Sequence, residues 1–140
     1  IHLACSDIAG KWMYGDKPFE VIRNGIVTKK FLFDVSKREK IRRELKINAE
    51  TFVVGNVGRF TEQKNHQRLI RIFAKIYELK KNSCLLLIGE GSLREKIEEE
   101  TEELGLSDRV KFLGSRTDVA DLLMGIDAFV MPSLFEGFGR

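Results

Sequence analysis

Apolar residues along this 140-residue chain follow two alternating patterns. Short runs that are apolar throughout end in glycine, as in TFVVGNVGRF (Thr51–Phe60) and SCLLLIGEG (Ser83–Gly91), which is typical of buried strands. Between these runs, apolar positions recur at the spacing of one helical face: Leu69, Ile70, Ile72, Phe73, Ile76 and Leu79. The pattern therefore predicts a strand, an amphipathic helix and a second strand.

The same unit recurs in the last third of the chain. RVKFLGS (Arg109–Ser115) precedes the helical pattern DVADLLMGI (Asp118–Ile126), and AFVMPS (Ala128–Ser133) begins a fourth unit. Strands that are apolar throughout and alternate with helices indicate a parallel sheet covered on both faces. The sequence therefore predicts a doubly wound α/β domain.

Two Ser-x-x-Glu patterns predict helix starts. The boxes at Ser92–Glu95 and Ser36–Glu39 match the capping box that closes the first turn of a helix. The second box opens a basic helix, KREKIRRELKI, in which only Ile41 and Leu45 form an apolar stripe. A solvated helix face is the favoured interpretation of this charge, and nucleic-acid binding is the alternative.

Composition narrows the class of protein. The chain is 43% hydrophobic with a net charge of +3, which fits one domain with an ordinary core and no surface for polyanions over the whole molecule. Its only cysteines, Cys5 and Cys84, have no CxxC spacing, which favours a reducing, cytoplasmic compartment. No apolar run approaches the length of a membrane span, and a chain that begins at Ile1 is expected to be a piece of a longer protein.

The loop that follows the first strong strand carries candidate phosphate ligands. Gly58 allows a close approach of the backbone, and Arg59 and Lys64 flank a predicted helix start. An arginine fork and a lysine point charge suit a diphosphate. A solvated loop with incidental charges is an equally good interpretation of this motif alone, and neither the Walker pattern nor GxGxxG is present. His66, at the same helix start, is interpreted as a cap or surface residue rather than a ligand.

The other strand ends carry weaker signals. Glycines in Gly89–Ser92 are explained by the steric needs of a strand-to-helix turn. Gly114–Asp118 is where a nucleotide base could lie, with Asp118 favoured as a helix N-cap. In the last loop, the carboxylate of Glu136 could accept hydrogen bonds from hydroxyl groups.

Taken together and in order, four motifs resemble one family. GNVGRFTEQKNHQRLI, LLIGEG, RVKFLGS and MPSLFEGFG look like the C-terminal nucleotide-sugar-binding domain of GT-B retaining glycosyltransferases of the family 4 type, also described as glycosyl transferases group 1. The resemblance covers about Val21–Arg140, including VIRNGI (Val21–Ile26). It implies a Rossmann-like domain over residues 34–140, truncated at its C-terminus, and a connection with the end of an N-terminal domain over residues 1–33.

The resemblance also implies a role for each matching residue. Arg59 and Lys64, beside Gly58, would hold the donor diphosphate and stabilise it as it leaves. Glu136 would contact the transferred sugar, and the second glutamate of the family motif would lie beyond Arg140. The resemblance assigns two further groups of residues. Gly114, Ser115 and Arg116 would lie along the nucleotide base, and the backbone amides of Gly137, Phe138 and Gly139 would line the sugar and phosphate.

The activity implied is transfer of a sugar, with retention, from a nucleotide diphosphate sugar to a carbohydrate or glycolipid acceptor in polysaccharide or glycolipid biosynthesis. No cofactor, metal or nucleic acid is expected, and the full protein is expected in the cytoplasm or at the cytoplasmic face of a membrane. The family reacts in a cleft between two Rossmann-like domains, so residues 1–140 alone are expected to be inactive. The alternative is a non-catalytic nucleotide-binding or interaction module.

Overall fold

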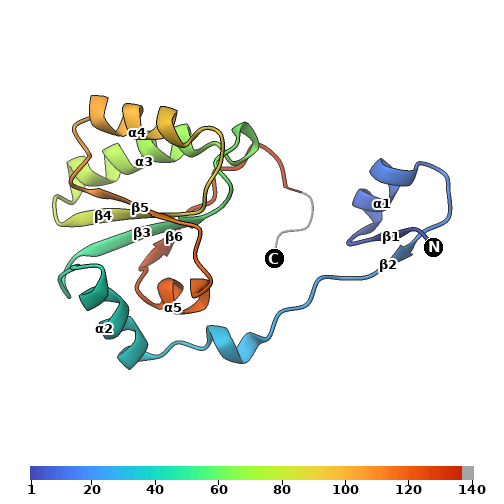
Figure 1. Ribbon diagram of the computed structural model, residues 1–140, viewed down its shortest axis with the longest axis horizontal. Coiled ribbons are helices and arrows are strands. Elements are labelled where there is room, and N and C mark those ends of the chain that lie inside the picture. The colour runs from blue at the N-terminus through green and yellow to red at the C-terminus, as the bar shows by residue number, and fades with distance from the viewer. Residues whose placement is uncertain (137–140) are drawn as a thin grey trace. The chain divides into compact units, whose positions relative to one another are not determined.

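The computed structural model describes residues 1–136, which divide into two compact units (Figure 1). One unit holds Ile1–Lys29 and also takes in Phe135 and Glu136, and the other is Lys30–Leu134. The predicted residues Gly137, Phe138 and Gly139 lie outside the described part of the chain.

The N-terminal unit is a short strand-helix-strand segment. Strands β1 (Leu3–Ala4) and β2 (Glu20–Val21) are parallel neighbours, and α1 (Asp7–Tyr14) connects them. The helix begins after Ser6, whose hydroxyl accepts a hydrogen bond from the backbone N–H of Ala9 at 3.1 Å. A 3₁₀ turn at Thr28–Phe31 follows along the chain.

The second unit contains a four-stranded sheet in the order β5-β4-β3-β6. The strands are β3 (Phe52–Val57), β4 (Ser83–Ile88), β5 (Val110–Gly114) and β6 (Ala128–Phe129). Every neighbouring pair is parallel. This confirms the parallel sheet predicted from the uniformly apolar strands.

Helices cover both faces of this sheet. Figure 1 shows α3 and α4 on one face and α2 and α5 on the other. The bounds are α2 (Val35–Glu44), α3 (His66–Leu79), α4 (Arg94–Glu103) and α5 (Val119–Met124), and a 3₁₀ turn at Glu62–Lys64 precedes α3. The predicted doubly wound α/β architecture is therefore confirmed.

Alternate strand residues supply two cores because successive side chains point to opposite faces. On the α3 and α4 face, Val54 and Leu85 pack with Leu69 and Phe73, and all four are fully buried. On the other face, Val53 and Leu86 pack with Ile47. Leu79, predicted on the inner face of its helix, is instead 91% exposed because it is the last residue of α3.

Both predicted capping boxes are wrong in detail. The N-cap of α2 is Asp34, whose carboxylate accepts hydrogen bonds from the backbone N–H groups of Ser36 (2.8 Å) and Lys37 (3.2 Å). Helix α4 has Leu93 as its N-cap, with no side-chain capping bond. The backbone N–H of Leu93 donates instead to the carbonyl of Phe60 at 3.1 Å, which ties the start of α4 to the loop after β3.

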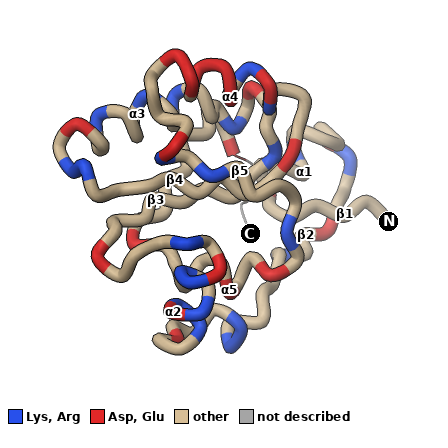
Figure 2. Tube along the Cα trace, turned by 60° about the vertical axis from the view of Figure 1, so that its left-hand side comes forward, with Lys and Arg blue, Asp and Glu red and all other residues tan. Residues whose placement is uncertain are grey.

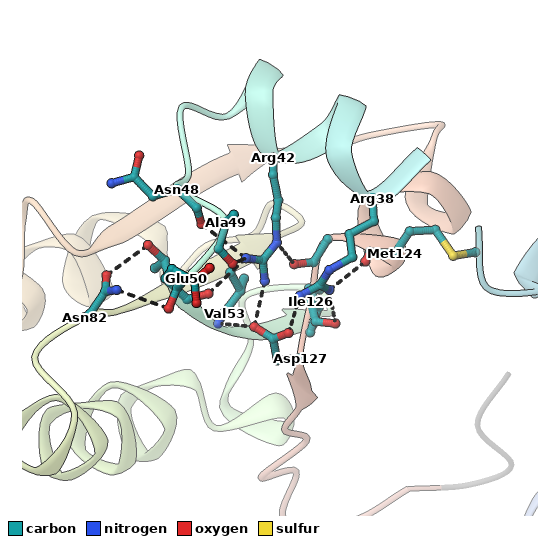
Figure 3. Close-up of polar contacts among 12 residues, drawn as sticks. Arg38, Arg42, Asn48, Ala49, Glu50, Val53, Asn82, Met124, Ile126 and Asp127 are labelled. Carbon is teal, nitrogen blue, oxygen red and sulfur yellow. Dashed lines mark hydrogen bonds and ion pairs between the residues drawn. The ribbon is translucent and has the colours of Figure 1, made fainter. Parts of the chain in front are cut away.

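The basic helix α2 is only partly a solvated face. Helix α2 is rich in lysine and arginine, whereas α4 is rich in glutamate (Figure 2). Arg42 is 5% exposed, and its guanidinium is surrounded by oxygen atoms (Figure 3). It donates to the carbonyls of Asn48 (3.2 Å), Ala49 (2.7 Å), Thr51 (3.0 Å) and Gly125 (3.2 Å). Arg42 is therefore an internal anchor, which the charge pattern did not reveal.

The carboxylate of Asp127 completes this anchor. It accepts from Arg42 at 2.7 Å, from Arg38, and from the backbone N–H of Val53 at 2.7 Å (Figure 3). The backbone N–H of Asp127 donates in return to the carbonyl of Val53 at 2.8 Å. Burial works against ionisation, but the Val53 N–H and the two arginines together hold the pKa of Asp127 below its ordinary value.

Replacing Asp127 by alanine is expected to destabilise the domain by about 3 kcal/mol or more, because the charge of Arg42 would remain buried without a counter-charge. Chemical denaturation with a fitted midpoint and slope measures this. The matched control is Asp121→Ala, which removes an exposed pair between Asp121 and Lys37 (2.6 Å) and should change stability little. Equal effects of the two variants would contradict the anchor.

Candidate functional site

The strand order places a topological switch point between β3 and β6. From β3 the chain proceeds outward through β4 to β5, and it then returns to β6 on the opposite side of β3. Open α/β sheets bind ligands in the crevice outside the carboxyl ends of the strands at such a point. The segments that follow β3 and β6 are therefore the candidate site.

Hydrogen bonds hold these two segments together. The side-chain amide of Asn56, in β3, donates to the carbonyl of Val130 at 2.7 Å. The backbone N–H of Val130 donates to Gly55 at 3.0 Å, and that of Leu134 donates to Gln63 at 2.8 Å. The chain after β6 thus runs along the loop after β3 as far as Leu134.

Arg59 and Lys64 both lie on the loop after β3, as the sequence predicted. Arg59 is exposed and directly follows Gly58, while Lys64 is half-buried at the end of the 3₁₀ turn. A Cβ atom at Gly58 would lie 3.6 Å from Cγ of Lys64, so the lysine stem passes beside the start of the loop. The switch point therefore carries two cations on one short loop.

The glycines of the second loop are required by close backbone packing. A Cβ atom at Gly89 would lie 2.0 Å from the carbonyl oxygen of Gly58, and one at Gly91 would lie 2.4 Å from that of Phe60. Gly89 also has a φ of +142°. These contacts confirm the steric interpretation of Gly89–Ser92 and show that the second loop supports the first.

In the third loop, ion pairs anchor Arg116. Its guanidinium donates to both carboxylate oxygens of Asp118 (2.8 and 2.6 Å) and to Glu44 (2.9 Å). Hydrogen bonds to these carboxylates, Asp118 first, raise the pKa of Arg116 above its ordinary value. Asp118 is the N-cap of α5, but its side chain makes no capping bond because it holds Arg116. Gly114 has a φ of +69°, and Ser115 is exposed.

Glu136 is exposed and groups with the N-terminal unit rather than with Arg59 and Lys64. The predicted residues on the first and third strand ends therefore belong to the unit Lys30–Leu134, and Glu136 belongs to the other unit.

The surface position expected for His66 is wrong. The residue is 2% exposed rather than on the surface, and its ring packs edge-on against Phe60 with 4.5 Å between ring centroids. Burial, with a smaller effect of the Lys64 charge, lowers the pKa of His66 to about 4. The sequence did contain a signal of this burial. His66 lies one helical turn before Leu69 and Ile70 and two turns before Phe73, so it shares their buried helical face.

Among residues 1–136, no helix has the length and apolar character to cross a membrane. No group of three or more His, Cys, Asp or Glu side chains in that range is arranged to hold a metal ion.

Residues 37–140 match the family described as glycosyl transferases group 1. The chain belongs to this family. Over 99 residues the group 1 chain is 41% identical to the lipopolysaccharide core biosynthesis glycosyltransferase LpsD of Rhizobium meliloti (strain 1021), covering 71% of this chain and 28% of LpsD. Over 141 residues it is 30% identical to the UDP-Gal:alpha-D-GlcNAc-diphosphoundecaprenol alpha-1,3-galactosyltransferase of Escherichia coli, covering 98% of this chain and 36% of that enzyme.

Solved structures agree with the fold. The group 1 chain is similar to Anabaena Alr3699/HepE in complex with UDP, with a TM-score of 0.82 and 28% identity, over 99% of this chain and 40% of that one. The neighbours are GT-B glycosyltransferases, and the Rossmann-like fold is therefore shown. The chain spans about a third of the length of the curated relatives named above, at 28% and 36%.

Gly89→Ala is expected to destabilise the group 1 domain by about 3 kcal/mol or more, because the new Cβ would overlap the backbone of Gly58 at an unfavourable φ. Gly105→Ala is the matched control, since Gly105 also has a positive φ of +66° but open space around it. Thermal unfolding of both variants compares the combined cost of overlap and strain at Gly89 with the cost of a left-handed backbone alone at Gly105. Similar losses in both would show that the contact with Gly58 is unimportant.

Stability is expected to fall as pH decreases from 6.5 to about 4, because over that range the unfolded chain protonates His66 and the folded domain does not. The free energy of unfolding is therefore greatest above pH 6.5, and protonation of the unfolded chain lowers it by up to roughly 3 kcal/mol at about pH 4. Replacing His66 by phenylalanine should flatten this part of a stability–pH profile. The exposed His2 is the control, and His2→Gln should leave the slope unchanged; an unaltered slope in His66→Phe would contradict the assignment.

Proposed function

We propose that this chain is the donor-binding domain of a retaining glycosyltransferase of the family 4 type, which transfers a sugar from a nucleotide diphosphate sugar to an acceptor hydroxyl. The observation that carries the proposal is the position of Arg59 and Lys64 on one loop at the switch point of the sheet. Membership of the glycosyl transferases group 1 family supports it.

The chemistry of the two cations suits a departing diphosphate. Negative charge develops on the leaving phosphate oxygens as the bond to the sugar breaks, and preformed positive groups stabilise that charge. Arg59 can fork to two oxygens, whereas Lys64 acts as a point charge. In this proposal they do so without a bound metal ion or other cofactor.

The remaining predicted residues take their proposed roles around this centre. The backbone of Gly114 and Ser115 would lie along the base, and Arg116 would be held beside it by Asp118 and Glu44. Glu136 would accept hydrogen bonds from the donor sugar, with the backbone of the residues after it along the phosphate.

The relatives suggest donors and acceptors to test. Alr3699/HepE has been solved with UDP and with UDP-glucose, so uridine donors are the first choice. LpsD is named for lipopolysaccharide core biosynthesis, and we propose a carbohydrate or glycolipid acceptor in polysaccharide or glycolipid synthesis, reached in the cytoplasm or at its membrane face. Residues 1–140 alone would bind the donor without transferring its sugar.

Arg59→Ala is expected to weaken the binding of UDP by about 2 kcal/mol, because it removes charge-assisted hydrogen bonds to the diphosphate. Isothermal calorimetry measures the affinity, with GDP and ADP as alternative probes. The control variant is Arg43→Ala, which removes an exposed arginine on α2 and should change nothing. Unchanged affinity in a folded Arg59→Ala variant would remove Arg59 from the site.

Glu136→Gln is expected to reduce the affinity for UDP-glucose relative to UDP, because a carboxylate that accepts from sugar hydroxyls does not contact the free nucleotide. The ratio of the two dissociation constants, wild type against variant, is the measurement. A chain that binds UDP and UDP-glucose equally well, with or without Glu136, would favour the alternative of a non-catalytic nucleotide-binding module.

A further inference from the structure

Unsatisfied polar atoms gather at the switch point. Among residues 1–136, the buried side-chain nitrogen and oxygen atoms that lack a hydrogen-bond partner are Oδ1 of Asn56, both ring nitrogens of His66, and Oγ of Ser133. Asn56 lies in β3, His66 begins α3, and Ser133 follows β6. Such atoms destabilise a fold unless they find partners, so their presence on the elements around the switch point indicates a use for them.

Two of these groups, Asn56 and His66, lie beside Gly58 together with Lys64. A Cβ atom there would lie 3.5 Å from Oδ1 of Asn56, 3.6 Å from Cγ of Lys64 and 3.7 Å from Cε1 of His66. The absence of a side chain at Gly58 therefore leaves the amide oxygen, the lysine stem and the imidazole edge around one small space. His66 also lines a pocket of about 250 Å³ between the loop after β3 and the first turns of α3 and α4.

The three groups have complementary hydrogen-bonding capacity. An uncharged imidazole has one N–H donor and one acceptor nitrogen. The Asn56 oxygen is an acceptor, since its amide nitrogen already donates to Val130. The ammonium of Lys64 has three protons, so it can donate to an imidazole and to other groups at the same time. Burial beside Lys64 keeps His66 uncharged, which preserves its acceptor nitrogen.

We propose that His66 is a positioning residue of the donor site: when a nucleotide binds, the unpaired ring nitrogens come to donate to the Asn56 amide oxygen and to accept from Lys64, so that the lysine ammonium is held at the diphosphate. The proposal rests on the function proposed above. It adds a residue that need not touch the donor and that acts through Lys64, and it explains why a buried polar ring occupies a place that an apolar ring could fill.

The test compares two substitutions of His66 that differ in hydrogen bonding. His66→Phe keeps a ring against Phe60 but removes both nitrogens, whereas His66→Gln restores one donor and one acceptor. We expect His66→Phe to be at least as stable as the wild type at pH 7 and to bind UDP about tenfold more weakly. His66→Gln should recover much of that affinity. A folded His66→Phe variant with unchanged affinity for UDP would overturn the proposal.

Nitrogen NMR of the histidine rings supplies a readout that a purely structural role would not move. The chain has only two histidines, so His2 is an internal reference. Addition of UDP should shift the ring nitrogen signals of His66 and leave those of His2 in place. Lys64→Met should reduce the shift that saturating UDP produces in the His66 signals, because it removes the proposed donor to the ring; an undiminished shift would contradict the proposed role of Lys64.

Two outcomes distinguish a failure of the proposed nucleotide binding from a failure of the positioning role of His66. If the wild type binds none of UDP, GDP and ADP, the proposed function fails and the positioning role fails with it. If the wild type binds UDP but UDP does not alter the His66 signals, the donor site stands and the positioning role is wrong.

Discussion

The arrangement of this domain depends on the hydrogen bonds and ion pairs that the carboxylate of Asp127 forms. Strand β6 is only two residues long, and it pairs with β3 through Val54 and Gly55 alone. Such a short strand gains little from its own ladder, so the side chain of Asp127 adds a connection to β3 through Val53 and to α2 through Arg42. Because β6 stands beside β3, the sheet has a switch point, and the cations of the first loop lie next to the chain that leaves β6.

Much of the fold could be predicted from the sequence, because its signals are local. The runs Phe52–Val57 and Ser83–Ile88 are apolar on both faces, which only a covered parallel sheet explains. The helix His66–Leu79 follows from its apolar spacing. Helix starts were predicted less well: at α4 a backbone bond from Leu93 to Phe60 replaces the side-chain cap, and such a long-range contact leaves no pattern in neighbouring residues.

The candidate site was predicted in part for the same reason. Arg59 and Lys64 belong to a continuous motif on one loop, so the sequence indicated them together. Arg116 was also indicated, but its partner Glu44 is 72 residues away, and the sequence does not reveal that the guanidinium is already engaged. Arg42 and His66 were placed at the surface because a charged or polar letter in a helix is usually solvated; here tertiary packing buries both.

The contact between Gly58 and Gly89 has a consequence for how donor preference can change. Since the backbones of the first two loops touch, neither can alter its path without moving the other, and the loop proposed to hold the diphosphate has a fixed shape. Ser115, by contrast, is exposed on a loop whose neighbour Arg116 is held by carboxylates rather than by backbone packing. For the proposed donor site, a search for altered nucleotide selectivity should therefore vary the exposed Ser115 and leave Gly114 and the two glycine loops intact, because Gly114 has a positive φ and its carbonyl accepts a backbone hydrogen bond from Gly89.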